Sequence, residues 1–148
     1  MVKSLIVFVL AFTGVFTIDQ NLKTIFLEGF RWYGDYFSLI LTYNKGVAFS
    51  MLSFLEGNLK YLQIALLSGV FLYLVFNRDI FKIYSLPVGM LLGAGCSNLY
   101  DRFIHSGVVD YFYWHKWFSF AVFNFADVMI NFSVLLILII SYRKAKST

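Results

Sequence analysis

The sequence predicts an α-helical membrane protein with four transmembrane helices and a small external β-sheet, or cradle, between helices 1 and 2. Of the 148 residues, 60% are hydrophobic, 21% are aromatic and only 14% are charged, and the mean hydropathy is +0.76. A soluble domain carries about a quarter charged residues. The composition therefore excludes an ordinary soluble enzyme, a disordered chain and a nucleic-acid-binding arm, so we expect no nucleic acid partner.

Four long intervals without charge define the expected helices. They lie between Lys3 and Asp19, Lys60 and Arg78, Lys82 and Asp101, and Asp127 and Arg143, and each holds 15 to 18 positions. A helix needs ~20 residues to cross a ~30 Å hydrocarbon core, so the bounding charges must lie at the interface or up to one turn inside it. We expect one membrane-embedded domain over 1–148, with spans near 4–22, 59–77, 83–100 and 124–142.

Four spans place both chain termini on the same side of the membrane. The basic segments closest to span ends are Arg143–Lys146 and the turn Asn77–Lys82, which favours a cytoplasmic location for both. Lys3 ahead of an apolar run is also compatible with a cleaved signal peptide. However, the run ends in Phe16-Thr17-Ile18-Asp19 without a small-residue cleavage site, which favours a retained first helix.

Two external segments follow, at about 24–58 and 101–123. In the first, Phe37–Tyr43 is β-branched and aromatic, Asn44-Lys45-Gly46 has turn chemistry, and Val47–Leu52 resumes the apolar pattern. This order predicts a hairpin or curved sheet on the outer membrane surface. The second segment is dense in aromatic residues over 111–118, which is typical of the headgroup layer.

Polar residues gather in the outer leaflet of this arrangement. Ionisable groups at membrane depth cost several kcal/mol unless they are paired or face water, so such a cluster marks a candidate functional site. Its members are Asp19, Asn98, Asp101, Arg102, Asp110, Asn124 and Asp127.

Several of these residues also have structural explanations. Asn124 and Asp127 have the spacing of a helix capping box, and Asp19 and Lys23 have the i,i+4 spacing of an ion pair. Asp101 at a helix C-terminus opposes the helix dipole and needs a partner such as Arg102. Asp110 follows Gly107-Val108-Val109 on the loop between spans three and four and has no capping pattern.

Asp110 and Asp127 are the candidates for paired acid–base chemistry. Two adjacent carboxyls cannot both ionise freely, so such a pair shares a proton near neutral pH. One can then deprotonate water while the other protonates a leaving group. We expect no metal and no cofactor, because His105 and His115 lack partners at metal-ligand spacing and Cys96 lies among small residues in the third span.

Four motifs together resemble bacterial lipoprotein signal peptidase, also called signal peptidase II. They are Asp19-Gln20-Asn21-Leu22-Lys23, Asn44-Lys45-Gly46-Val47-Ala48-Phe49-Ser50, Asn98-Leu99-Tyr100-Asp101-Arg102 with Gly107-Val108-Val109-Asp110-Tyr111, and Phe123-Asn124-Phe125-Ala126-Asp127. The resemblance implies an aspartic endopeptidase of the bacterial cytoplasmic (inner) membrane. It would cut prolipoproteins at the outer face, just before a cysteine that carries diacylglycerol.

The resemblance also implies roles for individual residues. Asp110 and Asp127 look like the catalytic pair. Residues that would orient the pair or bind substrate are Asn44, Gly46, Asn98, Arg102 and Asn124. Residues that would support the fold are Asp19, Lys23 and Asp101. Prolipoproteins and membrane lipids are the expected partners, and we expect a monomer.

Two positions depart from the family pattern. Ser97 replaces a glycine ahead of Asn98, and Tyr111 replaces the usual phenylalanine after Asp110. The alternative function is a non-enzymatic four-span transporter or channel subunit whose acids line an ion path. Such a path predicts polar residues throughout the bundle, whereas 128–142 carries no charge, which disfavours it.

Overall fold

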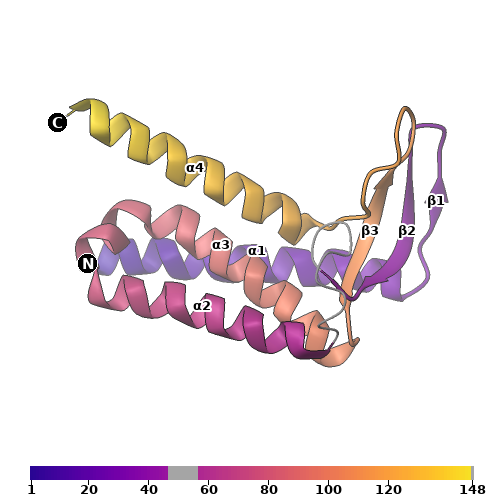
Figure 1. Ribbon diagram of the computed structural model, residues 1–148, viewed down its shortest axis with the longest axis horizontal. Coiled ribbons are helices and arrows are strands. Elements are labelled where there is room, and N and C mark those ends of the chain that lie inside the picture. Colours follow the sequence, from indigo (N-terminus) through magenta and orange to yellow (C-terminus); the bar gives the residue numbers. More distant parts are fainter. Residues whose placement is uncertain (47–56, 148) are drawn as a thin grey trace.

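The computed structural model describes residues 1–46 and 57–147. Helix α1 (Val2–Leu27) is followed by strands β1 (Trp32–Tyr33) and β2 (Phe37–Asn44), and then by helices α2 (Leu59–Phe76) and α3 (Arg78–Ile104). Strand β3 (Val108–Trp114) and helix α4 (Phe125–Ser147) complete the chain (Figure 1). The helices form a bundle, and the sheet stands across one end of it, which we call the sheet end. Both termini lie at the other end (Figure 1).

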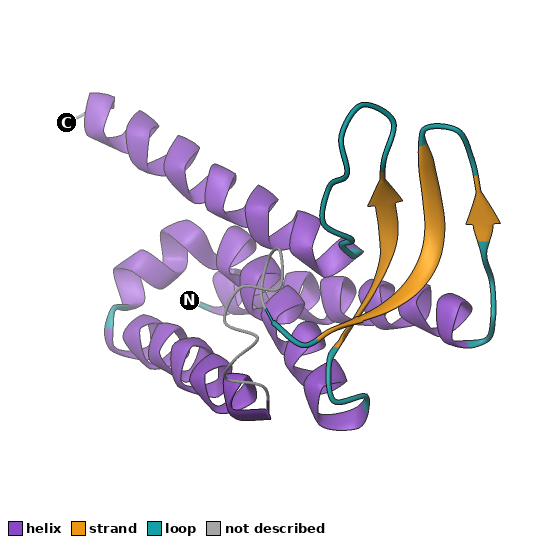
Figure 2. Ribbon diagram, turned by 45° about the vertical axis from the view of Figure 1, so that its right-hand side comes forward, coloured by secondary structure: helices purple, strands orange, loops and turns teal. Residues whose placement is uncertain are grey.

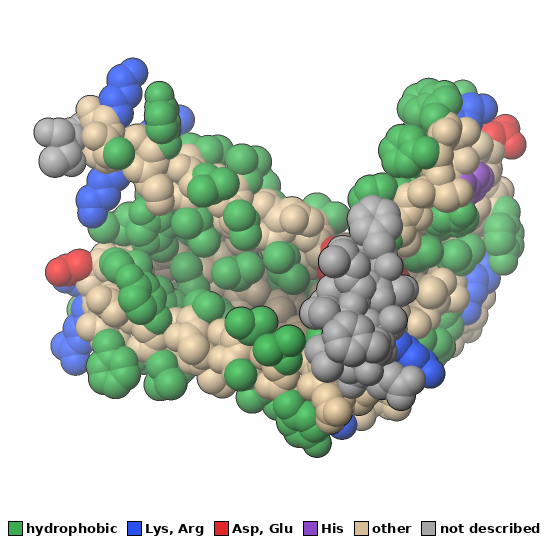
Figure 3. Space-filling view, viewed as in Figure 1, with side chains coloured by type: hydrophobic (Ala, Val, Ile, Leu, Met, Phe, Trp, Pro, Cys, Tyr) green, Lys and Arg blue, Asp and Glu red, His purple; other side chains and the backbone are tan. Residues whose placement is uncertain are grey.

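The four helices of the described residues are all long and apolar enough to cross a membrane. On the face that Figure 3 shows, hydrophobic side chains cover much of the helices, and Lys and Arg gather toward the two ends of the molecule. A multi-pass membrane protein with an external sheet, as the composition predicts, is therefore the observed architecture. Because α1 extends to Leu27, Asp19 and Lys23 lie inside this helix rather than at its end.

Helix α3 is the centre of the bundle. Its apolar window is 56% buried, against 11% for each of the other three helices, and it packs against α1, α2 and α4. Glycines let the helices approach closely: a Cβ on Gly93 would stand 2.5 Å from the backbone oxygen of Phe12, and one on Gly89 would stand 2.6 Å from that of Phe8. On the α2 side, a Cβ on Gly95 would stand 2.6 Å from Leu67. Small residues thus set these helix–helix distances.

The sheet is antiparallel, with the strand order β1-β2-β3 (Figure 2). Strand β2 lies where the sequence predicts it, but one of its partners comes from the second external segment, so the prediction of a sheet confined to the connection between helices 1 and 2 is incomplete. The second hairpin strand predicted at Val47–Leu52 lies outside the described residues. Thr42 pairs with Asp110 and Asn44 pairs with Val108, so Asp110 lies on a strand and not in a loop as predicted.

Candidate active site

Asp110 and Asp127 line the same cavity, which has a volume of about 620 Å³. Asp110 lies in the middle of β3 and Asp127 in the first turn of α4. The cavity is walled on one side by α2 and on the other by the start of α4. Apolar lining residues are Leu59, Leu62, Leu66, Val108, Phe120, Phe123, Val128 and Ile130. Polar lining residues besides the two carboxyls are Asn44, Gln63, Asn98, Arg102 and Asn131. The cavity therefore combines a polar group around the two carboxyls with a large apolar surface.

The Asp110 carboxyl is 1% exposed and has two amide donors. Asn44 Nδ2 donates to Oδ2 over 3.0 Å, and Asn124 Nδ2 donates to Oδ1 over 2.7 Å. Burial, reinforced by the negative charge of Asp127, raises the pKa of Asp110 to about 7, against the lowering effect of these two donors. Asp110 therefore holds a proton for much of the time near neutral pH.

Asp127 is held by the capping box that the sequence predicts. The Asn124 backbone N–H donates to Asp127 Oδ2 over 3.2 Å, and the Asp127 N–H donates to Asn124 Oδ1 over 2.9 Å. In addition, Asn98 Nδ2 donates to Asp127 Oδ1 over 2.9 Å. Asn124 thus caps α4 and, through its Nδ2, also reaches Asp110, so the capping function and the site function belong to one side chain.

The first amides of α4 are bound by residues from three parts of the chain. The Phe125 N–H donates to the Tyr111 hydroxyl over 3.0 Å, and the Ala126 N–H donates to Asp19 Oδ1 over 2.8 Å. The next N–H along the helix, that of Asp127, donates to Asn124 Oδ1. Since a helix N-terminus otherwise leaves these N–H groups without partners, the contacts fix the turn that carries Asp127 to β3 and α1.

A buried ion cluster, formed by Asp19, Lys23 and Asp101, lies next to this arrangement. Lys23 is 1% exposed, and its Nζ lies 2.6 Å from Asp19 Oδ2 and 2.7 Å from Asp101 Oδ2. The ion pair between Asp19 and Lys23 follows the predicted spacing. Asp101 has the cationic partner that its position at a helix end predicts, but the ion pair is formed by Lys23 of α1 and not by Arg102, the residue suggested from the sequence. Asp101 Oδ2 also accepts the Val109 N–H over 3.1 Å, which ties β3 to α3.

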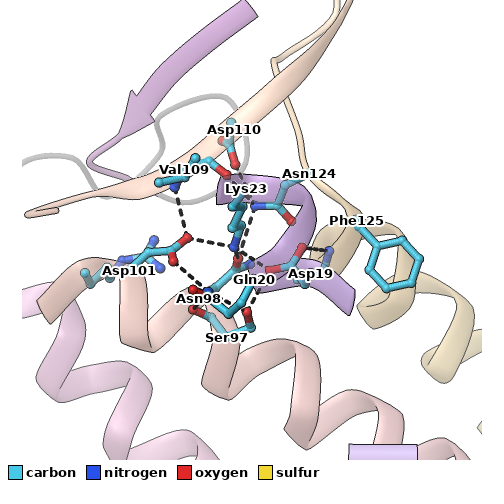
Figure 4. Close-up of polar contacts among 12 residues, drawn as sticks. Asp19, Gln20, Lys23, Ser97, Asn98, Asp101, Val109, Asp110, Asn124 and Phe125 are labelled. Atoms are coloured by element: carbon cyan, nitrogen blue, oxygen red, sulfur yellow. Dashed lines mark hydrogen bonds and ion pairs between the residues drawn. The ribbon is translucent and has the colours of Figure 1, made fainter. Parts of the chain in front are cut away.

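Two residues of this cluster were not identified from the sequence. Ser97 Oγ donates to Asp19 Oδ2 over 2.7 Å, and Gln20 Nε2 donates both to Ser97 Oγ and to Asp101 Oδ1, over 2.8 and 2.9 Å (Figure 4). The serine at the position of the family glycine therefore donates its hydroxyl to Asp19 and accepts from Gln20. Only the location of Gln20 in the first motif could have indicated its role.

Arg102 and Gly46 lie at the rim of the same cavity. Arg102 Nη1 donates to Gln63 Oε1 over 3.0 Å, and Nη2 donates to the Gly46 carbonyl oxygen. The Gly46 N–H in turn donates to Asn44 Oδ1 over 3.0 Å, which leaves the Asn44 amide group directed at Asp110. Arg102 therefore lines the cavity and also holds, through Gly46, the turn that positions the Asn44 side chain.

Within residues 1–46 and 57–147, no three His, Cys, Asp or Glu side chains are grouped as a metal site would require. His115 bonds to Ser38 Oγ over 2.9 Å, near the start of β2, whereas Asn44 lies at the end of that strand. That no metal or cofactor takes part stays a prediction.

Comparison with known proteins identifies the family. The family model described as signal peptidase (SPase) II matches residues 11–143. Lipoprotein signal peptidase of Campylobacter jejuni serotype O:2 is 61% identical over 87% of this chain and 83% of that protein. The enzyme of the same name from Sulfurimonas denitrificans is 51% identical over 96% and 92%.

Solved structures confirm the fold. One described as a bacterial membrane enzyme, determined by the in meso method at 2.3 Å resolution, has a TM-score of 0.79 and 21% identity, and the match covers all of this chain and 92% of that one. A second, at 1.9 Å resolution, has a TM-score of 0.70. The helices, the sheet and the sequence comparisons agree, and the chain, a multi-pass membrane peptidase, belongs to the signal peptidase II family.

Proposed function

We propose that this chain is an aspartic endopeptidase that removes the signal peptide from prolipoproteins by cutting just before a diacylglyceryl-modified cysteine. One observation carries the proposal: Asp110 and Asp127 line one cavity, and Asn124 donates to both carboxyls, to Asp110 from its side-chain amide and to Asp127 from its backbone N–H. The names of the relatives support the substrate class. The domain is the whole bundle over 1–148.

The two carboxyls divide the acid–base work. Asp110, with a pKa of about 7, holds the shared proton and transfers it to the oxygen of the scissile carbonyl as water adds to the carbonyl carbon. Asp127, at a helix N-terminus that favours negative charge, takes a proton from water as the water oxygen bonds to the carbonyl carbon. Asp127 then passes this proton to the leaving amine as the C–N bond breaks, and Asp110 regains its own proton as the carbonyl of the new carboxyl re-forms.

The substrate arrives as a membrane helix whose peptide bonds are masked until its end unwinds. The apolar wall formed by Leu59, Leu62 and Leu66 on α2 is suited to a signal helix that enters from the bilayer, and the dyad lies at the sheet end of that wall. We place the sheet end at the outer face of the bacterial inner membrane and both termini in the cytoplasm. Asn44, Asn98, Asn124 and Arg102 orient the dyad and the unwound segment, and the enzyme acts as a monomer.

The test is Asp110→Asn and Asp127→Asn, each assayed on a diacylglyceryl-modified prolipoprotein, with folding followed by thermal unfolding. Removing one acid–base group should lower kcat by about 10²- to 10⁴-fold. Asp79→Asn is the control, since Asp79 is exposed and forms a surface ion pair with Lys82, at the end of the bundle opposite the sheet. A well-folded variant of either dyad residue with near-normal turnover contradicts the proposal.

Two further arms test the finer claims. The same prolipoprotein without diacylglycerol should be cleaved far more slowly. The acyl chains of the modified substrate fix the depth of its cysteine, because burying them in the bilayer stabilises the bound position by ~0.8 kcal/mol per methylene. A chelator should leave turnover unchanged, and a loss that added metal restores would overturn the metal-free mechanism. The alternative of a transporter or channel subunit is not supported, since the family is one of peptidases.

A further inference from the structure

A second apolar groove, of about 620 Å³, lies on the opposite face of α2 from the candidate active site. Leu59, Leu62 and Leu66 face the active-site cavity, whereas Ile64, Leu67 and Phe71 face this groove. Its floor is α3 and its second wall is α1, both of which pack together in the bundle. The floor and far-wall residues are Leu92, Cys96, Leu99, Phe8, Val9 and Phe12.

The groove lies wholly within the membrane-spanning helices, and none of the described residues that line it is charged. On α2 it runs from Ile64 to Leu72. Lys60 lies one helical turn closer to the sheet end than Ile64. The length of α2 from Lys60 to Leu72 is ~18 Å at 1.5 Å per residue. The hydrocarbon layer of one leaflet is ~15 Å thick, half of the bilayer core. The groove therefore has the polarity and length that an acyl chain of one leaflet requires.

A positive charge lies at the sheet end of this groove. Phe103 continues the helical face formed by Cys96 and Leu99, and Lys60 Nζ lies 4.9 Å from the centre of its ring. Lys60 also lines a small pocket of about 180 Å³ together with Lys45, Ser106 and Arg102, and Arg102 reaches from this pocket to the active-site cavity, which it also lines. Every charged side chain among the described residues lining this pocket is a cation. The first turn of α2 adds to the positive potential, because it holds no acidic residue and its N-cap side chain makes no capping hydrogen bond within residues 1–46 and 57–147.

We propose that the groove and this basic pocket together bind one anionic phospholipid of the bilayer, with an acyl chain along α3 and the phosphate beside Lys60. Charge complementarity identifies the occupant. A diacylglyceryl cysteine has acyl chains but no phosphate, and its chains are tethered at the scissile bond, on the other face of α2. The bound lipid packs between α1 and α2 and so supports the wall of the active-site cavity.

The test measures binding of dioleoyl phosphatidylglycerol to the detergent-purified protein by native mass spectrometry. One molecule per chain should bind more tightly than any further ones. Lys60→Gln should weaken this binding about five-fold, the effect of one basic residue on an anionic lipid. Ser68→Trp, which fills the groove from α2, should abolish the tight site. Two substitutions are the matched controls. Lys82→Gln changes an exposed lysine at the end of the bundle opposite the sheet, and Leu138→Trp changes a lipid-facing position of α4 that is 61% exposed.

Two other ligands separate the parts of the site. Dioleoylglycerol, which lacks the phosphate, should bind more weakly than phosphatidylglycerol and should not respond to Lys60→Gln. Inorganic phosphate at the same concentration should not displace the lipid. The proposal is overturned if the folded Ser68→Trp and Lys60→Gln proteins bind phosphatidylglycerol as the parent does, or if inorganic phosphate alone competes for the site.

Discussion

Lys23 donates a hydrogen bond to the side-chain oxygen of Asn98 over 2.9 Å, and through it the buried ion cluster reaches the candidate catalytic pair. The same Asn98 donates to Asp127. The Nζ group of Lys23 thus has three partners, two carboxylates and one amide. Its position fixes which way the Asn98 amide points, because the amide oxygen faces the lysine and the amide nitrogen faces the aspartate.

Replacing Lys23 should therefore lower the free energy of unfolding of the protein and also disturb the positions of Asp110 and Asp127. Lys23→Met leaves Asp19 and Asp101, 0% and 1% exposed, without their cation, and loss of one partner of a buried pair costs about 3–5 kcal/mol. Chemical unfolding in detergent micelles measures the loss. Lys82→Met breaks the exposed pair with Asp79 and should cost at most about 1 kcal/mol. Equal effects of the two substitutions would contradict the account.

Asn44 should set the pH dependence of cleavage. Because the pair must keep one proton, kcat should fall as pH rises through the pKa of Asp110, about 7. The hydrogen bond from Asn44 stabilises the charged form of Asp110 and lowers its pKa. Asn44→Ala should therefore move the alkaline midpoint of kcat to higher pH. In the control Asn131→Ala, a cavity residue that bonds the Asp127 backbone oxygen instead, the midpoint should stay in place. A midpoint that falls in Asn44→Ala would refute this assignment.

Tyr111 should be a positioning residue for α4. Burial and the nearby Asp19 carboxylate raise the pKa of its hydroxyl, so the hydroxyl remains neutral while its oxygen accepts the Phe125 N–H. Its ring stacks on Phe26 with centroids 4.2 Å apart. Tyr111→Phe keeps the stacking and removes the cap, so it should lower the free energy of unfolding by about 1 kcal/mol. Asn124→Ala, which removes contacts to both aspartates, should lower kcat far more than Tyr111→Phe does, and the reverse order would count against the described geometry.

The close contact between α1 and α3 should not tolerate a methyl group. Gly93→Ala places a Cβ 2.5 Å from the Phe12 backbone oxygen, and overpacking of this kind costs about 1–3 kcal/mol. Gly69→Ala is the matched substitution on α2, where nothing lies within 4 Å of the added Cβ. It should be neutral or stabilising, because alanine is the better helix former. Thermal unfolding of the two variants in the same detergent checks the difference.

Local patterns in the sequence predicted the parts of the site that depend on neighbours in the chain. The spacing of Asp19 and Lys23 predicts their ion pair, and the spacing of Asn124 and Asp127 predicts the capping box. Both form because one helical turn brings the partners together.

Contacts between distant segments could not be predicted in this way. Lys23 and Asp101 belong to different helices, and nothing in the sequence of either one indicates the other. Strand β3 was missed because Val108–Trp114 is apolar on both faces near Asp110 and lacks the alternation that marks a half-buried strand. The bonds of Gln20 with Ser97 and Asp101 also depend on the crossing of α1 over α3.

The most direct test of the central claim is whether one proton is shared between Asp110 and Asp127. Infrared spectroscopy of the protein with ¹³C-labelled aspartate detects a protonated carboxyl by its C=O band. The account predicts such a band at about pH 5 that disappears with a midpoint near 7 and is absent or strongly shifted in Asp110→Asn. If both carboxyls are already ionised at about pH 5, with no band that depends on Asp110, the shared-proton mechanism is wrong.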